Sequence, residues 1–174
     1  LQPASRVSGR VDFSGTAKRP SLGSSGHGLR LDPVDGHFER LSFQIETDGT
    51  ISATGVPAGR YFVRLDSSVT PMGAWTLKSA MLAGRDVSDV PLTIAGADIT
   101  GLVVTFTDRA AVLAGTVRSV QSVSDEAATV LVFPTDRALW FDYGALPRRL
   151  RTARTGRTGE FFIPALPAGE YYVI

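Results

Sequence analysis

Apolar and polar residues alternate with a period of two along much of the chain. Leu41, Phe43 and Ile45 are interleaved with polar residues, and residues 60–65 and 102–107 follow a similar pattern. Such alternation is expected where one side of a β-strand is buried and the other side faces water. Glycine and proline separate the alternating runs, as turn residues do. Since no window carries a sustained apolar stripe at helical spacing, the pattern predicts an all-β chain.

A sequence repeat divides this alternating pattern into two halves. Residues 48–63 return as residues 158–173 without a gap, at an offset of 110 residues. Residues 7–11 are matched in a similar way by residues 113–117. Self-similarity of this kind marks tandem structural units. The sequence therefore predicts two related modules in one chain.

We expect the first module to cover residues 1–108 and the second to cover residues 109–174. In the first, the pattern predicts seven strands, at residues 5–13, 28–33, 38–47, 50–54, 60–67, 74–82 and 101–107. In the second it predicts five strands, at residues 112–118, 128–134, 149–155, 160–163 and 170–174. Seven short strands separated by turns are typical of a sandwich of two antiparallel sheets. By the logic of the repeat the second copy is truncated, so we expect the natural protein to continue past Ile174.

The composition narrows the range of functions. With 43% hydrophobic and 20% charged residues, the chain has an ordinary globular composition. The formal net charge of +1 gives no reason to expect contact with nucleic acid or with a membrane. The absence of cysteine excludes disulfides, thiolate catalysis and zinc–thiolate sites. The longest apolar run, at residues 102–104, is too short to cross a bilayer.

The repeated segments resemble the carboxypeptidase regulatory-like domain family, whose fold is prealbumin-like (transthyretin-like). The family pattern joins a Gly-x-Val strand to an Asp-Gly-x-Phe/Ile turn and a Leu-Pro-x-Gly-x-Tyr turn. It is matched at residues 9–11, 48–51 and 56–61 of the first module and at residues 115–117, 158–161 and 166–171 of the second. Two positions depart from the pattern, because Val56 replaces leucine and Thr158 replaces aspartate.

The resemblance implies a fold and a setting rather than a reaction. It implies two tandem prealbumin-like sandwiches that form a non-catalytic accessory segment, attached to the other domains of an exported bacterial protein. It further implies a location in the periplasm or at the cell surface.

The residues that catalysis or metal binding would need are few. The two histidines, His27 and His37, are expected in loops, and they fit neither a Ser-His-Asp triad nor the clustered histidines of a transthyretin-like hydrolase. Asp32 and Asp35 are expected in a plain turn, and a calcium site is the alternative. For residues 86–89 a turn is likewise expected, with a calcium site as the alternative. We therefore expect no enzyme, no metal and no cofactor.

A basic strip occupies residues 148–157, which contain five arginines. Arg149 and Arg151 would share one face of an extended strand. A solvated strand face is the favoured interpretation, and binding of phosphate or an acidic polymer is the alternative.

One loop of the second module holds the best candidate binding site, and a short helical turn is predicted there. Trp140, Phe141 and Tyr143 are accompanied by Asp136 and Arg137. Exposed aromatic rings with nearby acids suit stacking on sugars, and they also anchor protein partners. The competing interpretation is that Trp140 folds back onto the open end of the sandwich as part of the core.

Three functions are consistent with these features. The leading hypothesis is a spacer or protein-interaction module, whose partners are the other domains of the parent protein or a protein ligand. The alternative is a carbohydrate-binding module that holds a glycan on the aromatic residues near Trp140. A hydrolase is the third and least supported.

Overall fold

The structure is a computed structural model that describes residues 4–23, 28–34, 40–65, 73–121, 124–125, 127–141 and 147–174. The chain divides into two compact units. The first contains Leu1–Arg109, and the second contains Ala110–Phe141 and Pro147–Ile174. Over the described residues, regular structure consists of β-strands and one short 3-10 helix. The predicted all-β class is therefore confirmed.

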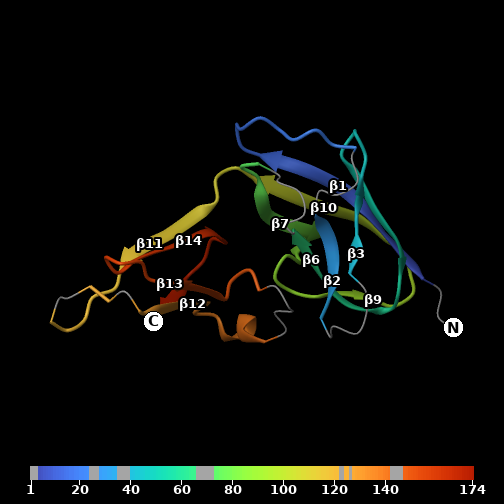
Figure 1. Ribbon diagram of the computed structural model, residues 1–174. Coiled ribbons are helices and arrows are strands. Elements are labelled where there is room, and N and C mark those ends of the chain that lie inside the picture. The colour runs from blue at the N-terminus through green and yellow to red at the C-terminus, as the bar shows by residue number, and fades with distance from the viewer. Residues whose placement is uncertain are drawn as a thin grey trace. The chain divides into compact units, whose positions relative to one another are not determined.

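The first unit is a sandwich of two sheets. Its strands are β1 (Ser5–Ser14), β2 (Leu29–Pro33), β3 (Leu41–Ser42), β4 (Gln44–Ile45), β5 (Thr50–Val56), β6 (Gly59–Leu65), β7 (Thr76–Leu82), β8 (Arg85–Asp86), β9 (Leu92–Ile94) and β10 (Ile99–Thr107). One sheet has six strands in the order β4-β5-β1-β10-β7-β8, and the other has four in the order β3-β2-β6-β9. Figure 1 shows β1, β10 and β7 side by side in the larger sheet.

The strand predicted at residues 38–47 is divided in two, because the chain changes sheets within it. β3 pairs with β2, whereas β4 pairs with β5 in the other sheet. Phe43 lies between them with 4% of its surface exposed. The short strands β8 and β9 were not among the predicted strands, since two or three residues carry too little alternation to be recognised.

One strand pair departs from the predicted antiparallel arrangement. β1 and β10 run parallel, whereas the other strand pairs among the described residues are antiparallel. The two backbones approach closely at Gly9, where the register shifts. A Cβ atom at Gly9 would lie 2.6 Å from the carbonyl carbon of Leu102 and closer still to its oxygen. Glycine is therefore the residue that this contact requires.

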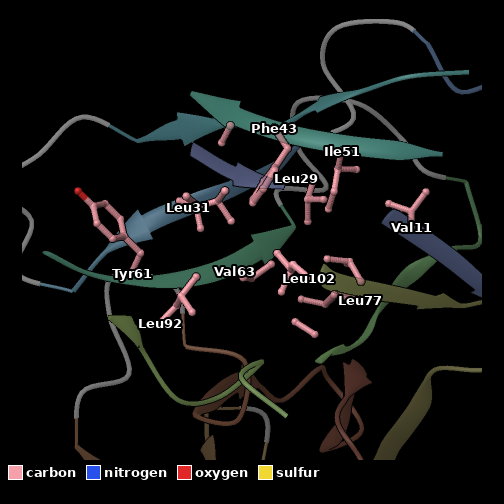
Figure 2. Close-up of a cluster of buried hydrophobic side chains, with 14 of the residues drawn as sticks. Val11, Leu29, Leu31, Phe43, Ile51, Tyr61, Val63, Leu77, Leu92 and Leu102 are labelled. Atoms are coloured by element: carbon pink, nitrogen blue, oxygen red, sulfur yellow. The ribbon is translucent and has the colours of Figure 1, made fainter. Parts of the chain in front are cut away.

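The core of the first unit lies between its two sheets. Figure 2 shows apolar side chains that project into this space from both sheets, among them Val11, Leu29, Leu31, Phe43, Ile51, Tyr61, Val63, Leu77, Leu92 and Leu102. Tyr61 is fully buried, and its hydroxyl donates a hydrogen bond to the Pro57 carbonyl at 3.1 Å. Trp75 also belongs to this core, and its indole N–H donates to the Lys18 carbonyl at 3.0 Å.

The second unit contains two smaller sheets. Its elements are β11 (Ala111–Thr116), β12 (Thr129–Pro134), the 3-10 helix η1 (Arg137–Trp140), β13 (Arg151–Arg154), β14 (Glu160–Leu166) and β15 (Tyr171–Val173). β11 pairs with β14, and β13, β12 and β15 form the other sheet in that order. Figure 1 shows the β11–β14 pair as yellow and red arrows. The helical turn predicted from Asp136 is present as η1.

The sequence repeat is a structural repeat down to the register of its strands. Gly9 of β1 lies opposite Ile51 of β5, and Gly115 of β11 lies opposite Phe161 of β14. Each of these ladders also carries a register shift at the equivalent place near its start. Positions in β1 thus correspond to positions in β11, and positions in β5 correspond to positions in β14.

The Asp-Gly turn of the first copy recurs in the second with its acid and its threonine exchanged. The Asp48 carboxylate accepts a hydrogen bond from the Thr50 N–H at 2.8 Å. In the second copy the Glu160 carboxylate accepts hydrogen bonds from the Thr158 N–H, at 2.9 Å, and from the Thr158 hydroxyl. Thr158, the departure from the family pattern, is therefore compensated by an acid two residues later.

Hydrogen bonds lower the pKa of three carboxyl groups. A backbone N–H two residues further on lowers the pKa of Asp48, and the threonine hydroxyl lowers that of Glu160. The pKa of Asp108 is lowered chiefly by the N–H of Ala17, which donates to its carboxylate at 2.6 Å. All three groups are therefore expected to remain ionised in the folded protein at a pH where the unfolded chain begins to take up protons.

Stability is accordingly expected to fall in acid. A carboxyl group with a lowered folded-state pKa contributes stability above its unfolded pKa, about 4, and loses that contribution as the pH falls through the folded value. Urea titrations should give a free energy of unfolding that decreases below about pH 4.5, and Asp48→Asn should reduce this slope. A profile that remains flat between about pH 5 and pH 2 would contradict the assignment.

Candidate functional site

Two strands of the second unit carry aromatic side chains on the face turned away from its core. Phe133 of β12 lies opposite Tyr172 of β15, and their ring centroids are 5.3 Å apart with planes tilted by 41°. The neighbouring Val132 is fully buried in the core, so the alternation of the strand places Phe133 on the outer side. Tyr172 is 50% exposed.

The 3-10 helix after β12 adds a third ring to this face. Asp136 is its N-cap, and the Asp136 carboxylate accepts a hydrogen bond from the Ala138 N–H at 2.9 Å. The turn brings Trp140 back to β12, where its indole N–H donates to the Pro134 carbonyl at 2.7 Å. The indole meets the Phe133 ring edge-on, with centroids 5.5 Å apart at 75°.

The remaining predicted residues lie around this indole or outside the described part of the chain. Phe141 follows the helix and is 73% exposed. The guanidinium of Arg137 lies 5.6 Å from the centroid of the Trp140 ring, within range of a cation–π interaction. Tyr143 lies outside the described residues. We refer below to Phe133, Trp140, Phe141 and Tyr172 as the aromatic surface.

Trp140 matches neither of the two roles considered for it from the sequence. The indole is half-buried, so it is not a free platform, yet it is not one of the residues of the buried cluster of the second unit. It packs on the outer face of the sheet and is held there by its hydrogen bond. Phe133 and Tyr172 were not predicted as site residues, although their outward positions in alternating strands were a usable signal.

The chemistry of the aromatic surface is that of an apolar binding patch. Exposed rings offer contact area at low cost in conformational entropy. The Asp136 carboxylate already caps η1, and the indole N–H already bonds to a carbonyl. Over the described residues, no group of three or more histidine or acidic side chains could hold a metal ion. The aromatic surface therefore offers apolar contact area, and its nearest polar groups are already engaged within the unit.

The corresponding face of the first unit is different, because it is buried and charged. Asp32 and Phe62 occupy the places equivalent to Phe133 and Tyr172 and face each other across β2 and β6. The guanidinium of Arg64 lies 4.1 Å from the Phe62 ring centroid and donates to the Ser88 carbonyl at 2.7 Å. The residues Asp32, Phe62, Arg64 and Ser88 are all buried.

The Asp32 carboxylate is engaged in an ion pair and does not face an open site. Arg30 donates to it through Nε at 2.6 Å, and Arg40 lies 4.0 Å away. Asp35, the other carboxylate considered for calcium, lies outside the described residues, as do His27 and His37.

Two of the remaining charged candidates, Asp86 and Arg149, have structural partners in the chain. Asp86 accepts a hydrogen bond from the Ser88 N–H at 2.8 Å, which closes a turn. Arg149 of the basic strip donates to the Ala168 carbonyl and to the Tyr171 hydroxyl, both at 3.0 Å. That arginine therefore fixes the proline–glycine turn of the second copy. Throughout the described segments, no helix is long and apolar enough to span a membrane.

Comparison with known proteins gives distant similarities. No protein-family model matches the chain, and no curated protein matches its sequence. A DUF3823 family protein from Parabacteroides merdae aligns with 95% of this chain and 81% of its own length, at 16% identity and a TM-score of 0.37. The Bacillus anthracis TIE protein aligns with 99% of this chain and 31% of its own length, at 11% identity and a TM-score of 0.33. These likenesses assign no family, and the resemblance to the carboxypeptidase regulatory-like domain stays a prediction.

Proposed function

We propose that this chain is a non-catalytic accessory segment of an exported bacterial protein, and that its second unit binds a protein partner through the aromatic surface. The observation that carries the proposal is the cluster of Phe133, Trp140, Phe141 and Tyr172 on the outer face of β12 and β15. Exposed apolar patches of this kind mark interaction sites on soluble proteins. The family resemblance supports the accessory role, because such domains are mostly appendages of larger proteins.

A protein partner fits this surface better than a glycan does. Sugar recognition combines a flat aromatic face with polar groups that bind hydroxyls. Here the Trp140 and Phe133 rings meet edge to face, and Arg137 lies over the indole ring. The nearest carboxylate, that of Asp136, bonds to the backbone. Apolar side chains of a partner could bury Tyr172 and Phe141 without needing these polar groups.

Selection from a random peptide library displayed on phage tests this proposal. We expect the full chain to select peptides rich in aromatic and branched apolar residues. The double variant Phe141→Ser, Tyr172→Ser should bind them at least tenfold more weakly, because truncation of central aromatic residues costs about 2 kcal/mol or more. Val120→Ser is the matched control, since Val120 is fully exposed and does not belong to the aromatic surface.

A glycan panel provides the opposing outcome. Saccharide binding that is lost in Trp140→Ala, with an unchanged melting temperature, would replace the protein partner with a carbohydrate. Peptides that bind the double variant as tightly as the wild-type chain would also overturn the proposal, because the aromatic surface would then be unnecessary.

A further inference from the structure

The paired strands β11 and β14 carry apolar side chains on the face turned away from the core of the second unit. Leu113 and Ile163 contribute to that core, so the alternation of the strands places their neighbours on the opposite, outer face. Val112 is 54% exposed and Phe162 is 61% exposed. We refer below to the exposed residues Val112, Ala114, Phe162 and Pro164 as the apolar face.

The first unit has polar residues at the four equivalent positions, which are Arg6 and Ser8 on β1 and Ser52 and Thr54 on β5. Arg6 and Thr54 are exposed there, although β7, β8, β9 and β10 follow β6 in that unit. Strands of this fold therefore do not cover this face. Strands that are apolar on both faces are typical of sheets that are buried on both sides. The exchange of polar for apolar residues thus indicates a contact that is particular to the second unit.

The apolar face has a shape that can pack against a second copy of itself. Phe162 lies directly opposite Ala114 in the β11–β14 ladder, so a large side chain stands beside a small one. A two-fold axis that runs between these strands, parallel to them, would place β11 of one copy over β14 of the other. Each Phe162 ring would then fill the space above the partner's Ala114. Sheets that pack face to face in this way lie about 10 Å apart with their strands nearly aligned.

The charges at one end of the apolar face are complementary under the same two-fold axis. Thr116 lies opposite Glu160, and Arg118 follows Thr116 by two residues, or about 7 Å of strand. Val117 packs against the core, so Arg118 is on the outer side, and no carboxylate of the described residues pairs with it. Oε2 of Glu160 accepts both hydrogen bonds from Thr158, which leaves Oε1 available. Each Arg118 could therefore reach the partner's Glu160.

We propose that the apolar face binds a second copy of this chain and forms a two-fold symmetric dimer. Packing of Phe162 on Ala114 supplies the apolar contact, and the two Arg118–Glu160 pairs fix the orientation. Two strands offer a contact at the small end of the range of interface sizes, so the dissociation constant is expected to be about 10–500 µM. The dimer uses the β11–β14 sheet, whereas the aromatic surface belongs to β12 and β15, so the two proposals are independent.

Sedimentation velocity of the full chain, at concentrations from about 10 µM to about 1 mM, tests the proposal. We expect a monomer–dimer equilibrium that Phe162→Ser weakens by about tenfold or more. This variant should fold, because the first copy has Ser52 at the equivalent position. The double variant Phe141→Ser, Tyr172→Ser is the control, since it removes exposed rings from the aromatic surface and should leave dimerisation unchanged. A monomer at every concentration, or a dimer that is insensitive to Phe162→Ser, would overturn the proposal.

Mixing two charge variants tests the symmetry of the contact. Arg118→Glu alone would place two acids together at both ends of the dimer, and Glu160→Arg alone would place two arginines together, so each variant should dimerise less than the wild-type chain. An equal mixture of the two should recover dimerisation as a heterodimer, because opposite charges then meet at both contacts. A mixture of folded variants that stays as monomeric as its components would contradict the two-fold arrangement. If Glu160→Arg fails to fold because the turn at Thr158 is lost, Phe162→Ser still decides the outcome.

Discussion

Gly9→Ala is expected to unfold the first unit, whereas Gly115→Ala, the same change in the second copy, is expected to be tolerated. The methyl group at position 9 would overlap the Leu102 carbonyl, which belongs to the backbone of a central strand. Neither strand can withdraw without breaking the ladder between β1 and β10. We expect a loss of about 3 kcal/mol or more for Gly9→Ala and less than about 1 kcal/mol for Gly115→Ala.

Tryptophan fluorescence during urea denaturation measures this contrast within a single chain. Trp75 reports on the first unit, where it is buried against Phe13, and Trp140→Phe removes the signal of the second unit. The midpoint reported by Trp75 should shift strongly in Gly9→Ala and stay near that of the parent protein in Gly115→Ala. Equal shifts for the two variants would show that β1 and β10 do not approach each other as described.

Asp32→Ala is expected to cost about 3–5 kcal/mol, because it leaves the buried guanidinium of Arg30 without its carboxylate. The exposed fractions are 6% for Arg30 and 3% for Asp32, and the Nε–Oδ1 distance is 2.6 Å. A buried charge that loses its partner retains its desolvation penalty. The double change Arg30→Met, Asp32→Leu should recover most of the lost stability, since apolar residues of similar size carry no such penalty.

The chain contains a matched control for this experiment. Arg10 and Asp12 are also an arginine and an aspartate two residues apart in a strand, with a Nε–Oδ1 distance of 3.3 Å, but their side chains are 65% and 46% exposed. Asp12→Ala should therefore cost less than about 1 kcal/mol, as is usual for surface ion pairs. Equal losses for Asp12→Ala and Asp32→Ala, measured by urea denaturation, would show that burial does not determine the effect.

The sequence predicted the features of the fold that depend on the local residue pattern and on the repeat, namely the strands and the two related copies. Alternating residues located most strands of both units, and the repeated glycine and proline turns indicated two related copies. In both copies of the Asp-Gly turn, a carboxylate accepts a hydrogen bond from a threonine N–H. The sequence alone did not reveal this shared arrangement, because the acid and the threonine exchange places between residues 48–50 and residues 158–160. From the sequence, Thr158 is only a departure from the family pattern. That Glu160 takes over the role of the missing aspartate depends on its side chain folding back to the Thr158 N–H, which the residue pattern does not specify.

The features that were missed depend on distant parts of the chain. The parallel pairing of β1 with β10 joins the two ends of the first unit, and no local pattern specifies its direction. Alternation over residues 60–65 indicates that Arg64 faces away from the core, but it could not predict that this second face is buried too. The aromatic surface was found in part, at Trp140 and Phe141. Its other rings come from β12 and β15, which the sequence does not show to be adjacent.

The pairing of β1 with β10 has a consequence for how the chain acquires its fold during synthesis. The Arg6 N–H bonds to the Asp98 carboxylate across 92 residues, so the first strand must wait for nearly the whole unit to be made. At about 5–20 residues per second this delay lasts roughly 5–20 s. On the ribosome the larger sheet of the first unit can therefore be completed before the second unit has been made. A full-length chain diluted from denaturant has no such order, because the strands of both units are available for pairing at the same time. We expect refolding to be slower and more prone to mispairing than synthesis.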